Sequence, residues 1–170
     1  NGTELKNRLL MAPMTTCTGY YDGTVTSELV EYYRARAGSI GTIIVECCFV
    51  DDLGLAFPGA IGIDNDEKIA GLAKIADAIK SKGSKALLQI YHGGRMVDPK
   101  LIGGRTPVGP SAVAAPRDGA ATPVALTAEE VEGMIGKFGE AVRRAIQAGF
   151  DGVEIHGANT YLIQQFFSPN

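Results

Sequence analysis

The stretch "QAGFDGVEIHGANTYL", residues 147–162, contains a helix end, a glycine, an aliphatic strand and a polar turn, in that order. The same order, up to the strand, occurs in "RAGSIGTIIVE" (36–46) and in "SKGSKALLQIY" (81–91). Each segment has a glycine where the end of a helix requires a left-handed residue, namely Gly38, Gly83 and Gly149. Three repetitions of one pattern predict a chain in which helices alternate with strands.

The helices expected before these strands have recognisable starts and apolar faces. Thr26 is a suitable N-cap for a helix over 27–38, and Thr127 with Glu130 has the spacing of a capping box. The segment 66–83 places apolar residues on one helical stripe, namely Ile69, Leu72, Ile75, Ala76 and Ile79. The helix after Thr127 does the same with Val131, Met134, Ile135, Phe138, Val142 and Ile146.

With "NRLLMAP" (7–13) as a first strand, the order of elements is βαβαβαβ, and a further helix begins near Tyr161. Strands separated by helices are parallel and are covered on both faces. This α/β pattern fits either an open doubly wound sheet or part of a (β/α)8 TIM barrel. The dinucleotide fingerprint G-x-G-x-x-G is absent after the first strand, where "APMTTC" (12–17) stands, and this disfavours the open sheet.

A complete barrel needs about 250 residues, whereas this chain has 170. We therefore expect residues 1–170 to be the first four βα units, which form the N-terminal half of a single barrel domain. Residues 93–126 are rich in Gly, Pro and Ala and have no sustained period. A linker between domains is one interpretation, but similar strand and helix patterns flank the segment, which favours a long working loop after the third strand.

The composition excludes several classes of protein. A hydrophobic fraction of 45%, a charged fraction of 21% and a net charge of −3 are those of an ordinary globular protein. The charges are mixed, with no basic stripe that would indicate binding to nucleic acid or to an anionic membrane. The longest apolar stretch, 40–50, is too short to span a bilayer. Three cysteines without framework spacing, and no signal-peptide core, predict a cytoplasmic protein.

Four polar residues lie near the carboxyl ends of the predicted strands, namely Glu46, Gln89, Glu154 and His156. An unpaired buried polar group costs about 1–3 kcal/mol, so such residues need a reason to be there. Parallel α/β proteins bind their ligands at this end of the strands. Any one of the four can be explained by a neighbouring partner, but four at one rim indicate a ligand site.

Six motifs follow one another along the chain: "LKNRLLMAPM" (5–14), "IIVE" (43–46), "LLQIYHGGR" (87–95), "GPSA" (109–112), "ATPVALT" (121–127) and "GFDGVEIHGANTYLIQQFFSPN" (149–170). In order and spacing they resemble the old yellow enzyme family of NADH:flavin oxidoreductases, the FMN-dependent ene-reductases. The resemblance covers essentially the whole chain and corresponds to the N-terminal half of the family's barrel. Each motif is weak alone, whereas six in register are specific.

The resemblance implies an FMN site at the strand ends. The family lays the backbone after its first strand against the flavin, here at Ala12, Pro13 and Met14. Thr15 occupies the position that bonds the flavin carbonyl O4, and the backbone of Cys47 would meet the same ring edge. Gln89 fits the amide that bonds the pyrimidine end of the flavin, since a carboxamide both donates and accepts.

The resemblance also implies the catalytic residues. His156 and Asn159 fit the pair that holds the substrate carbonyl oxygen, and Tyr161 fits the proton donor. Hydride transfer to an alkene places negative charge on that oxygen, which two donors would stabilise, and a phenol can then protonate the α-carbon. The expected function is an FMN-dependent oxidoreductase that takes hydride from NADH or NADPH and reduces activated C=C bonds of α,β-unsaturated carbonyl compounds.

Two other functions stay open. Ligand types for a metal-dependent barrel hydrolase or aldolase are present at Glu46, His92, Glu154 and His156, but without H-x-H or H-E-x-x-H spacing, so we predict no metal site. A half barrel can also be a non-catalytic module, because its sheet leaves two open edges. Barrels of this type bind phosphate with loops after strands seven and eight. We therefore expect the chain alone to be inactive, and to associate with its missing C-terminal half or form a homo-oligomer.

Overall fold

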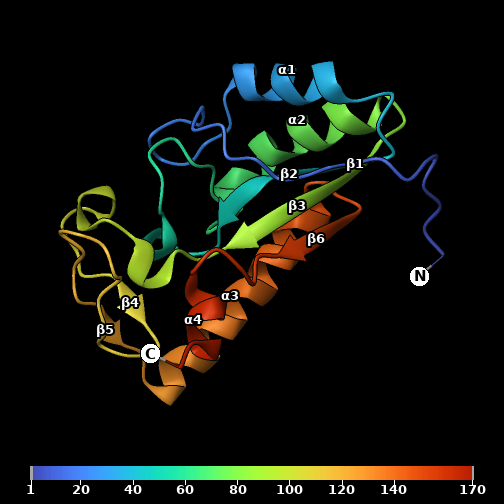
Figure 1. The fold of residues 1–170 in the computed structure, drawn as a ribbon. Coiled ribbons are helices and arrows are strands. Elements are labelled where there is room, and N and C mark those ends of the chain that lie inside the picture. The colour runs from blue at the N-terminus through green and yellow to red at the C-terminus, as the bar shows by residue number, and fades with distance from the viewer. Residues whose placement is uncertain (1, 170) are drawn as a thin grey trace.

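The computed structural model describes residues 2–169, and its centre is a sheet of four parallel strands in the order β1-β2-β3-β6 (Figure 1). The strands are β1 (Leu10–Met11), β2 (Thr42–Phe49), β3 (Lys85–Tyr91) and β6 (Gly152–Ile155). The helices between them are α1 (Ser27–Arg36), α2 (Ile69–Lys80) and α3 (Ala128–Gln147), and the short α4 (Leu162–Phe167) follows β6. The predicted order of elements, with a helix starting after Tyr161, is confirmed.

Two of the helices start at the predicted caps. The side chain of Thr26 accepts the N–H of Leu29 at the start of α1. Thr127 and Glu130 form a reciprocal capping box at the start of α3. The glycines predicted to follow the helices all have positive φ angles of 113°, 77° and 87°, at Gly38, Gly83 and Gly149. Glycine adopts this backbone without strain, so each helix can stop and turn back toward the sheet.

The first strand is much shorter than the predicted segment 7–13. The side-chain oxygen of Asn7 accepts the N–H of Leu9, and its amide nitrogen donates to the carbonyl of Ser39 at 2.8 Å. A side chain thus takes the place of strand pairing at this end. At the other end Pro13 has no N–H to donate. Only two residues of β1 therefore pair with β2.

β2 continues three residues beyond its predicted end at Glu46. It pairs with β3 in parallel, and the register shifts between Val45 and Cys48. Such an irregularity is a β-bulge, which redirects side chains relative to a regular strand. The prediction that Glu46 ends the strand at the rim is wrong. The bulge contains Glu46 and Cys47, which have separate environments in the structure.

The hydrophobic core lies between the sheet and the helices α1, α2 and α3. The predicted stripe of α2 is buried in it at Leu72, Ile75, Ala76 and Ile79, with Ile69 at the margin. The apolar face of α3 is only partly covered: Met134 is buried, but Ile135 and Ile146 are 60% and 65% exposed. One flank of α3 lies along β6. Because β6 is the last strand of the sheet, no further strand lies beside it within residues 2–169.

Residues 93–126 form a long excursion between β3 and α3, as predicted, and contain short elements of their own. These are two 3-10 turns, Gly94–Met96 and Pro99–Ile102, and the paired strands β4 (Val108–Gly109) and β5 (Val124–Ala125). The first turn contacts α4, and Figure 1 shows the excursion at the carboxyl end of β3. No helix in the described part of the chain is both long enough and apolar enough to cross a membrane.

A buried carboxyl group joins β2 to α1 and to the segment after β1. One oxygen of Glu46 accepts the hydroxyl of Tyr33 at 3.2 Å, and the other accepts the N–H of Thr16 at 3.2 Å. The Tyr33 hydroxyl also accepts the backbone N–H of Glu46 at 2.8 Å. Burial raises the pKa of the Glu46 carboxyl, although hydrogen bonds from Thr16 and Tyr33 act in the opposite direction. Glu46 therefore anchors the loop after β1.

Replacing this carboxyl should change how stability depends on pH. Because its folded pKa is raised, Glu46 contributes stability below the unfolded pKa of about 4.3 that is lost as pH rises through the folded value. Glu46→Gln removes this titration, and Glu132→Gln makes the same change on an exposed part of α3. Urea unfolding at several pH values should show the wild type losing stability relative to Glu46→Gln, but not relative to the control, as pH rises. A difference that stays constant would contradict the assignment.

Candidate active site

The site residues that the family resemblance implies all lie within or just beyond the carboxyl halves of the four strands. They are Ala12, Pro13, Met14 and Thr15 after β1, Cys47 in β2, Gln89 in β3, and His156, Asn159 and Tyr161 after β6. Parallel strands present these ends on one edge of the sheet. The last two residues lie in the donor turn, as we call residues 157–161, which leads from β6 into α4.

The segment after β1 lies against the bulge of β2. The Thr15 hydroxyl and the Cys47 sulfur are 3.1 Å apart, within hydrogen-bonding distance. Cys47 is buried, and burial raises the pKa of its thiol to about 11, so the thiol is neutral at physiological pH. The neighbouring Met14 is 64% exposed. This corner of the site therefore combines a hydroxyl with a large, solvent-facing apolar side chain.

Gln89 and Glu154 are paired directly across β3 and β6. The Gln89 amide nitrogen donates to one Glu154 oxygen at 3.2 Å. The other oxygen, Oε2, is buried and accepts no hydrogen bond from the described residues. An unsatisfied buried acceptor costs about 1–3 kcal/mol. A donor supplied by a bound group or by another segment would stabilise this pair.

His156 follows β6 directly, and its backbone N–H donates to the carbonyl of Ile90 at 3.0 Å. The ring is largely buried, with the residue 9% exposed, and burial lowers its pKa while the charge of Glu154 acts in the opposite direction. The N–H of Ala158 points to His156 Nδ1 at 3.4 Å. In the neutral ring this leaves the proton on Nε2, which can donate to an oxygen of a ligand.

Tyr161 is packed among aromatic side chains. Its ring centroid lies 5.0 Å from that of His156 at an interplanar angle of 89°, and 5.3 Å from that of Tyr91. Phe57 makes a further edge contact at 6.3 Å. Burial, followed by the proximity of Cys47, raises the pKa of the Tyr161 hydroxyl to about 12. The phenol is therefore protonated at neutral pH, as a proton donor must be.

Asn159 is exposed in the donor turn, where the backbone is left-handed at two successive residues. The φ angles are 56° at Asn159 and 62° at Thr160. Asparagine tolerates this region, but a β-branched threonine rarely adopts it, and such strain costs on the order of 1–3 kcal/mol. The turn is therefore held by its surroundings, not by local preference.

The residues considered as metal ligands do not assemble into one site. Glu46 is engaged with Tyr33 and Thr16. His92 is fully buried, its Nδ1 accepts the N–H of Gly94 at 3.0 Å, and burial lowers its pKa to about 4. Within residues 2–169, no group of three or more His, Cys, Asp or Glu side chains is placed to bind a metal ion.

Sequence reasoning missed three residues that shape the site, namely Phe57, Tyr91 and Gln165. Tyr91 could have been found, because it is two residues beyond Gln89 and shares its face of the strand. Phe57 belongs to the irregular segment after β2, and its contact with Tyr161 has no sequence pattern. Gln165 is buried against residues 93–95 through hydrogen bonds with distant backbone groups, which have no sequence pattern.

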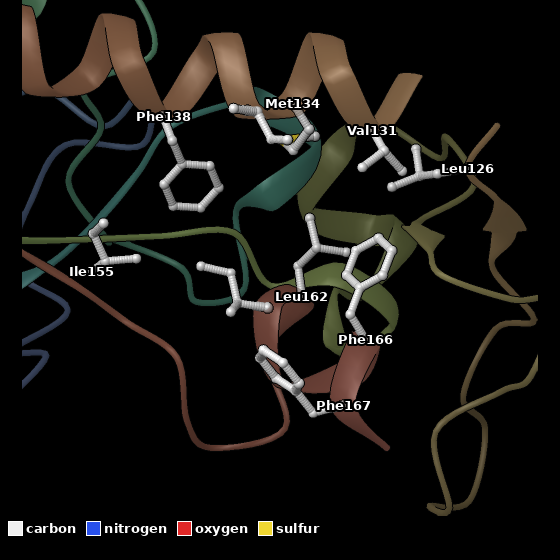
Figure 2. A pocket seen from close by; sticks show the side chains of 10 residues that line it. Leu126, Val131, Met134, Phe138, Ile155, Leu162, Phe166 and Phe167 are labelled. Carbon is white, nitrogen blue, oxygen red and sulfur yellow. The ribbon is translucent and has the colours of Figure 1, made fainter. Parts of the chain in front are cut away.

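A separate apolar groove lies between α3 and α4 (Figure 2). It encloses about 330 Å³ and is lined by apolar side chains, including Met134, Phe138, Ile155, Leu162 and Phe166. Figure 2 shows side chains of α3 and α4 facing each other across it, with Ile155 of β6 at one end. Within residues 2–169, only apolar residues line the groove, so their side chains cannot orient a polar ligand.

Several known proteins are similar to this chain over almost its whole length. The NADH:fumarate oxidoreductase of Klebsiella pneumoniae (strain 342) is 88% identical over 170 residues, which are 100% of this chain and 18% of that protein. The solved structure of the old yellow enzyme homologue from Zymomonas mobilis has a TM-score of 0.91 at 35% identity, over 99% of this chain and 49% of that chain. Morphinone reductase in complex with tetrahydroNAD has a TM-score of 0.92 at 32% identity, over 99% and 50%.

This chain thus spans about half the length of the solved structures that it matches. The likeness confirms the predicted fold, in which the chain is the first four βα units of a TIM barrel, and the resemblance to old yellow enzymes. The sequence model of the NADH:flavin oxidoreductase / NADH oxidase family matches residues 1–170. The chain belongs to that family.

Proposed function

We propose that this chain provides the flavin and substrate face of an FMN-dependent oxidoreductase, which takes hydride from NADH or NADPH and reduces activated C=C bonds of α,β-unsaturated carbonyl compounds. The observation that carries the proposal is the contact between His156 and Tyr161 at the strand ends. Burial lowers the pKa of one and raises that of the other, so both are neutral donors at physiological pH. Neutral donors suit an oxygen that gains negative charge during the reaction.

The strand ends fit FMN, which supplies hydride transfer between a nicotinamide and an acceptor when bound. A flavin ring has apolar faces and a polar edge. The exposed Met14 offers apolar surface, and the Thr15 hydroxyl lies beside it. Gln89 offers a carboxamide for the pyrimidine edge, and the unpaired oxygen of Glu154 beside it marks this part of the sheet as suited to a donor. These residues would hold the ring.

The residues after β6 would act on the substrate. His156 and Asn159 would donate hydrogen bonds to the carbonyl oxygen and so stabilise the negative charge that develops on it. Tyr161 would donate its hydroxyl proton to the α-carbon. The surrounding rings of Tyr91 and Phe57 partly bury the Tyr161 side chain, and burial raises the pKa of its hydroxyl.

A second candidate function comes from the length of the Klebsiella relative. That protein is named for fumarate, but this chain matches only 18% of it. The match therefore does not show which part of that protein reacts with fumarate. The alternative is that this site oxidises NADH and passes the electrons to another part of a longer protein. The two functions share the flavin and differ in the acceptor, so the residues after β6 distinguish them.

Tyr161→Phe in the FMN-loaded enzyme should spare flavin reduction by NADH and slow reduction of the alkene by about 10²–10⁴-fold, because the proton donor is lost while the ring packing stays. Tyr20→Phe, at an exposed tyrosine, is the control. Stopped-flow absorbance follows each half-reaction separately. An unchanged alkene half-reaction would remove Tyr161 from the mechanism. A wild type that accepts hydride from NADH but reduces no alkene would favour the second function.

His156→Ala and Asn159→Ala should each weaken binding of a phenol by about 10–100-fold, because a phenolate oxygen mimics the charged substrate oxygen and loses one donor. The long-wavelength charge-transfer band of the phenol with oxidised flavin should be lost with it. Asn159→His keeps a donor in a residue that also tolerates positive φ, and should retain binding. Titration of the flavin spectrum measures all three. Unchanged affinity in both alanine variants would place the oxygen elsewhere.

We also propose that the remaining half of the barrel covers the apolar groove and the free edge of β6. The groove presents a contiguous apolar surface, whereas isolated exposed apolar residues are normal on a protein surface. The solved structures that match this chain are about twice its length. An uncovered strand edge also leaves backbone groups unpaired. In a solution of the isolated chain, a second copy would cover the groove and the free edge of β6, because the solution contains no other protein.

The isolated chain of residues 1–170 should therefore self-associate and bind FMN weakly. Ile135→Glu places a charge in the groove and should lower the association, whereas Val113→Glu changes an exposed apolar residue in the loop after β3, outside the groove, and should not. Sedimentation velocity measures the association, and flavin fluorescence measures the binding of FMN. A monomer that holds FMN with micromolar affinity would overturn this proposal.

A further inference from the structure

The donor turn needs a restraint, because Asn159 and Thr160 are both left-handed and threonine resists that conformation. Hydrogen bonds to both sides of Thr160 supply it. The N–H of Thr160 donates to the side-chain oxygen of Gln164, and its carbonyl accepts the side-chain N–H of Gln165 at 2.6 Å. Gln164 is exposed, whereas Gln165 is 6% exposed. The bond from Gln165 is partly buried, so water competes with it less than with the bond to the exposed Gln164.

Gln165 also connects the donor turn to the loop after β3. Its amide nitrogen donates a second hydrogen bond to the carbonyl of Gly93 at 3.2 Å, and its oxygen accepts the N–H of Arg95 at 3.1 Å. The carboxamide thus uses both of its N–H groups and its oxygen. Two segments that are more than sixty residues apart in sequence meet through one side chain.

The loop after β3 is shaped around this amide. Gly94 has φ 60°, and a Cβ at this position would lie 2.3 Å from the Gln165 oxygen. His92 fixes the same loop, because its ring accepts the N–H of Gly94 and its carbonyl accepts the N–H of Leu162 at the start of α4. Residues 92–95 therefore form a rigid support on which Gln165 rests.

We propose that Gln165 is a positioning residue, which holds Asn159 and Tyr161 in their reactive arrangement by fastening the donor turn to residues 93–95. The proposal rests on the function proposed for that turn. All three hydrogen bonds of the Gln165 carboxamide go to backbone groups, so the side chain acts through the backbone of Thr160. Without it, only the exposed bond to Gln164 still holds Thr160, so Thr160 leaves the left-handed region more readily and the residues on either side of it move.

Gln165→Met tests this directly, because methionine has a similar length and fills the space but cannot hydrogen-bond. In the FMN-loaded enzyme, phenol affinity and the rate of the alkene half-reaction should fall by about tenfold or more. This is the size expected when the two hydrogen bonds that the Gln165 amide donates, to Thr160 and to Gly93, are lost. Flavin content should stay within about twofold, because the residues proposed to hold the flavin ring lie outside the donor turn. Gln147→Met makes the same change at a glutamine in the last turn of α3, away from the turn, and is the control. Phenol affinity within twofold of the wild type would overturn the proposal.

Gln165→Glu gives a second test, which also decides if the methionine variant does not fold. The carboxyl can still accept the N–H of Arg95, but it can donate to the Thr160 carbonyl only when protonated. The activity of this variant relative to the wild type should therefore rise as pH falls. A ratio that is flat with pH would contradict a positioning role, since a loss of packing alone has no such dependence.

The same experiments separate this inference from the proposed function. If the wild type reduces alkenes and binds phenols while both Gln165 variants behave like it, the positioning role fails and the function stands. If the wild type neither reduces alkenes nor binds phenols, the function of the donor turn fails first, and the inference fails with it.

Discussion

The parallel register of β3 with its two neighbours is the constraint on which the candidate site depends. Val45 of β2 faces Leu88, and Glu154 of β6 faces Gln89. A shift of one residue would turn every side chain of a strand to the opposite face, and the Gln89–Glu154 bond would be lost. The register also ends the strands together, so that the loops after them can contact one another.

Burial decides the chemistry of the groups that these loops bring together. The Cys47 thiol and the Tyr161 hydroxyl have raised pKa values and His156 has a lowered one, in each case mainly because an ion would lose its hydration. These three groups are therefore neutral at physiological pH. A neutral hydrogen-bond donor that already points at a substrate oxygen stabilises the negative charge that develops there. This is the electrostatic arrangement of an oxyanion hole.

The structure separates two surfaces of different character. The strand ends carry polar groups that are paired with one another or left with a spare acceptor, as at Glu154. Among the described residues, the groove beside α3 is lined by apolar side chains alone, and it borders β6, the last strand of the sheet there. A polar rim is suited to a small ligand, whereas an apolar groove beside a free strand edge is suited to further protein. The half barrel therefore presents a polar rim, for which we propose a catalytic role, and an apolar groove, for which we propose a role in assembly.

Local patterns in the sequence were sufficient to predict the four strands of the main sheet, the helices after them, and their order. Caps at Thr26 and Thr127 act over three or four residues, and the glycines after the helices act on their own backbone, so no distant contact is needed to predict them. The family motifs also placed His156, Asn159 and Tyr161 at one rim. Only the tertiary structure decided what depends on contacts between distant segments. Examples are the bulge that separates Glu46 from Cys47, the two-residue length of β1, and the bond from Gln165 to the strained donor turn. Their physical reason is the same: each depends on a partner that the folded chain brings close, and sequence distance carries no information about that partner.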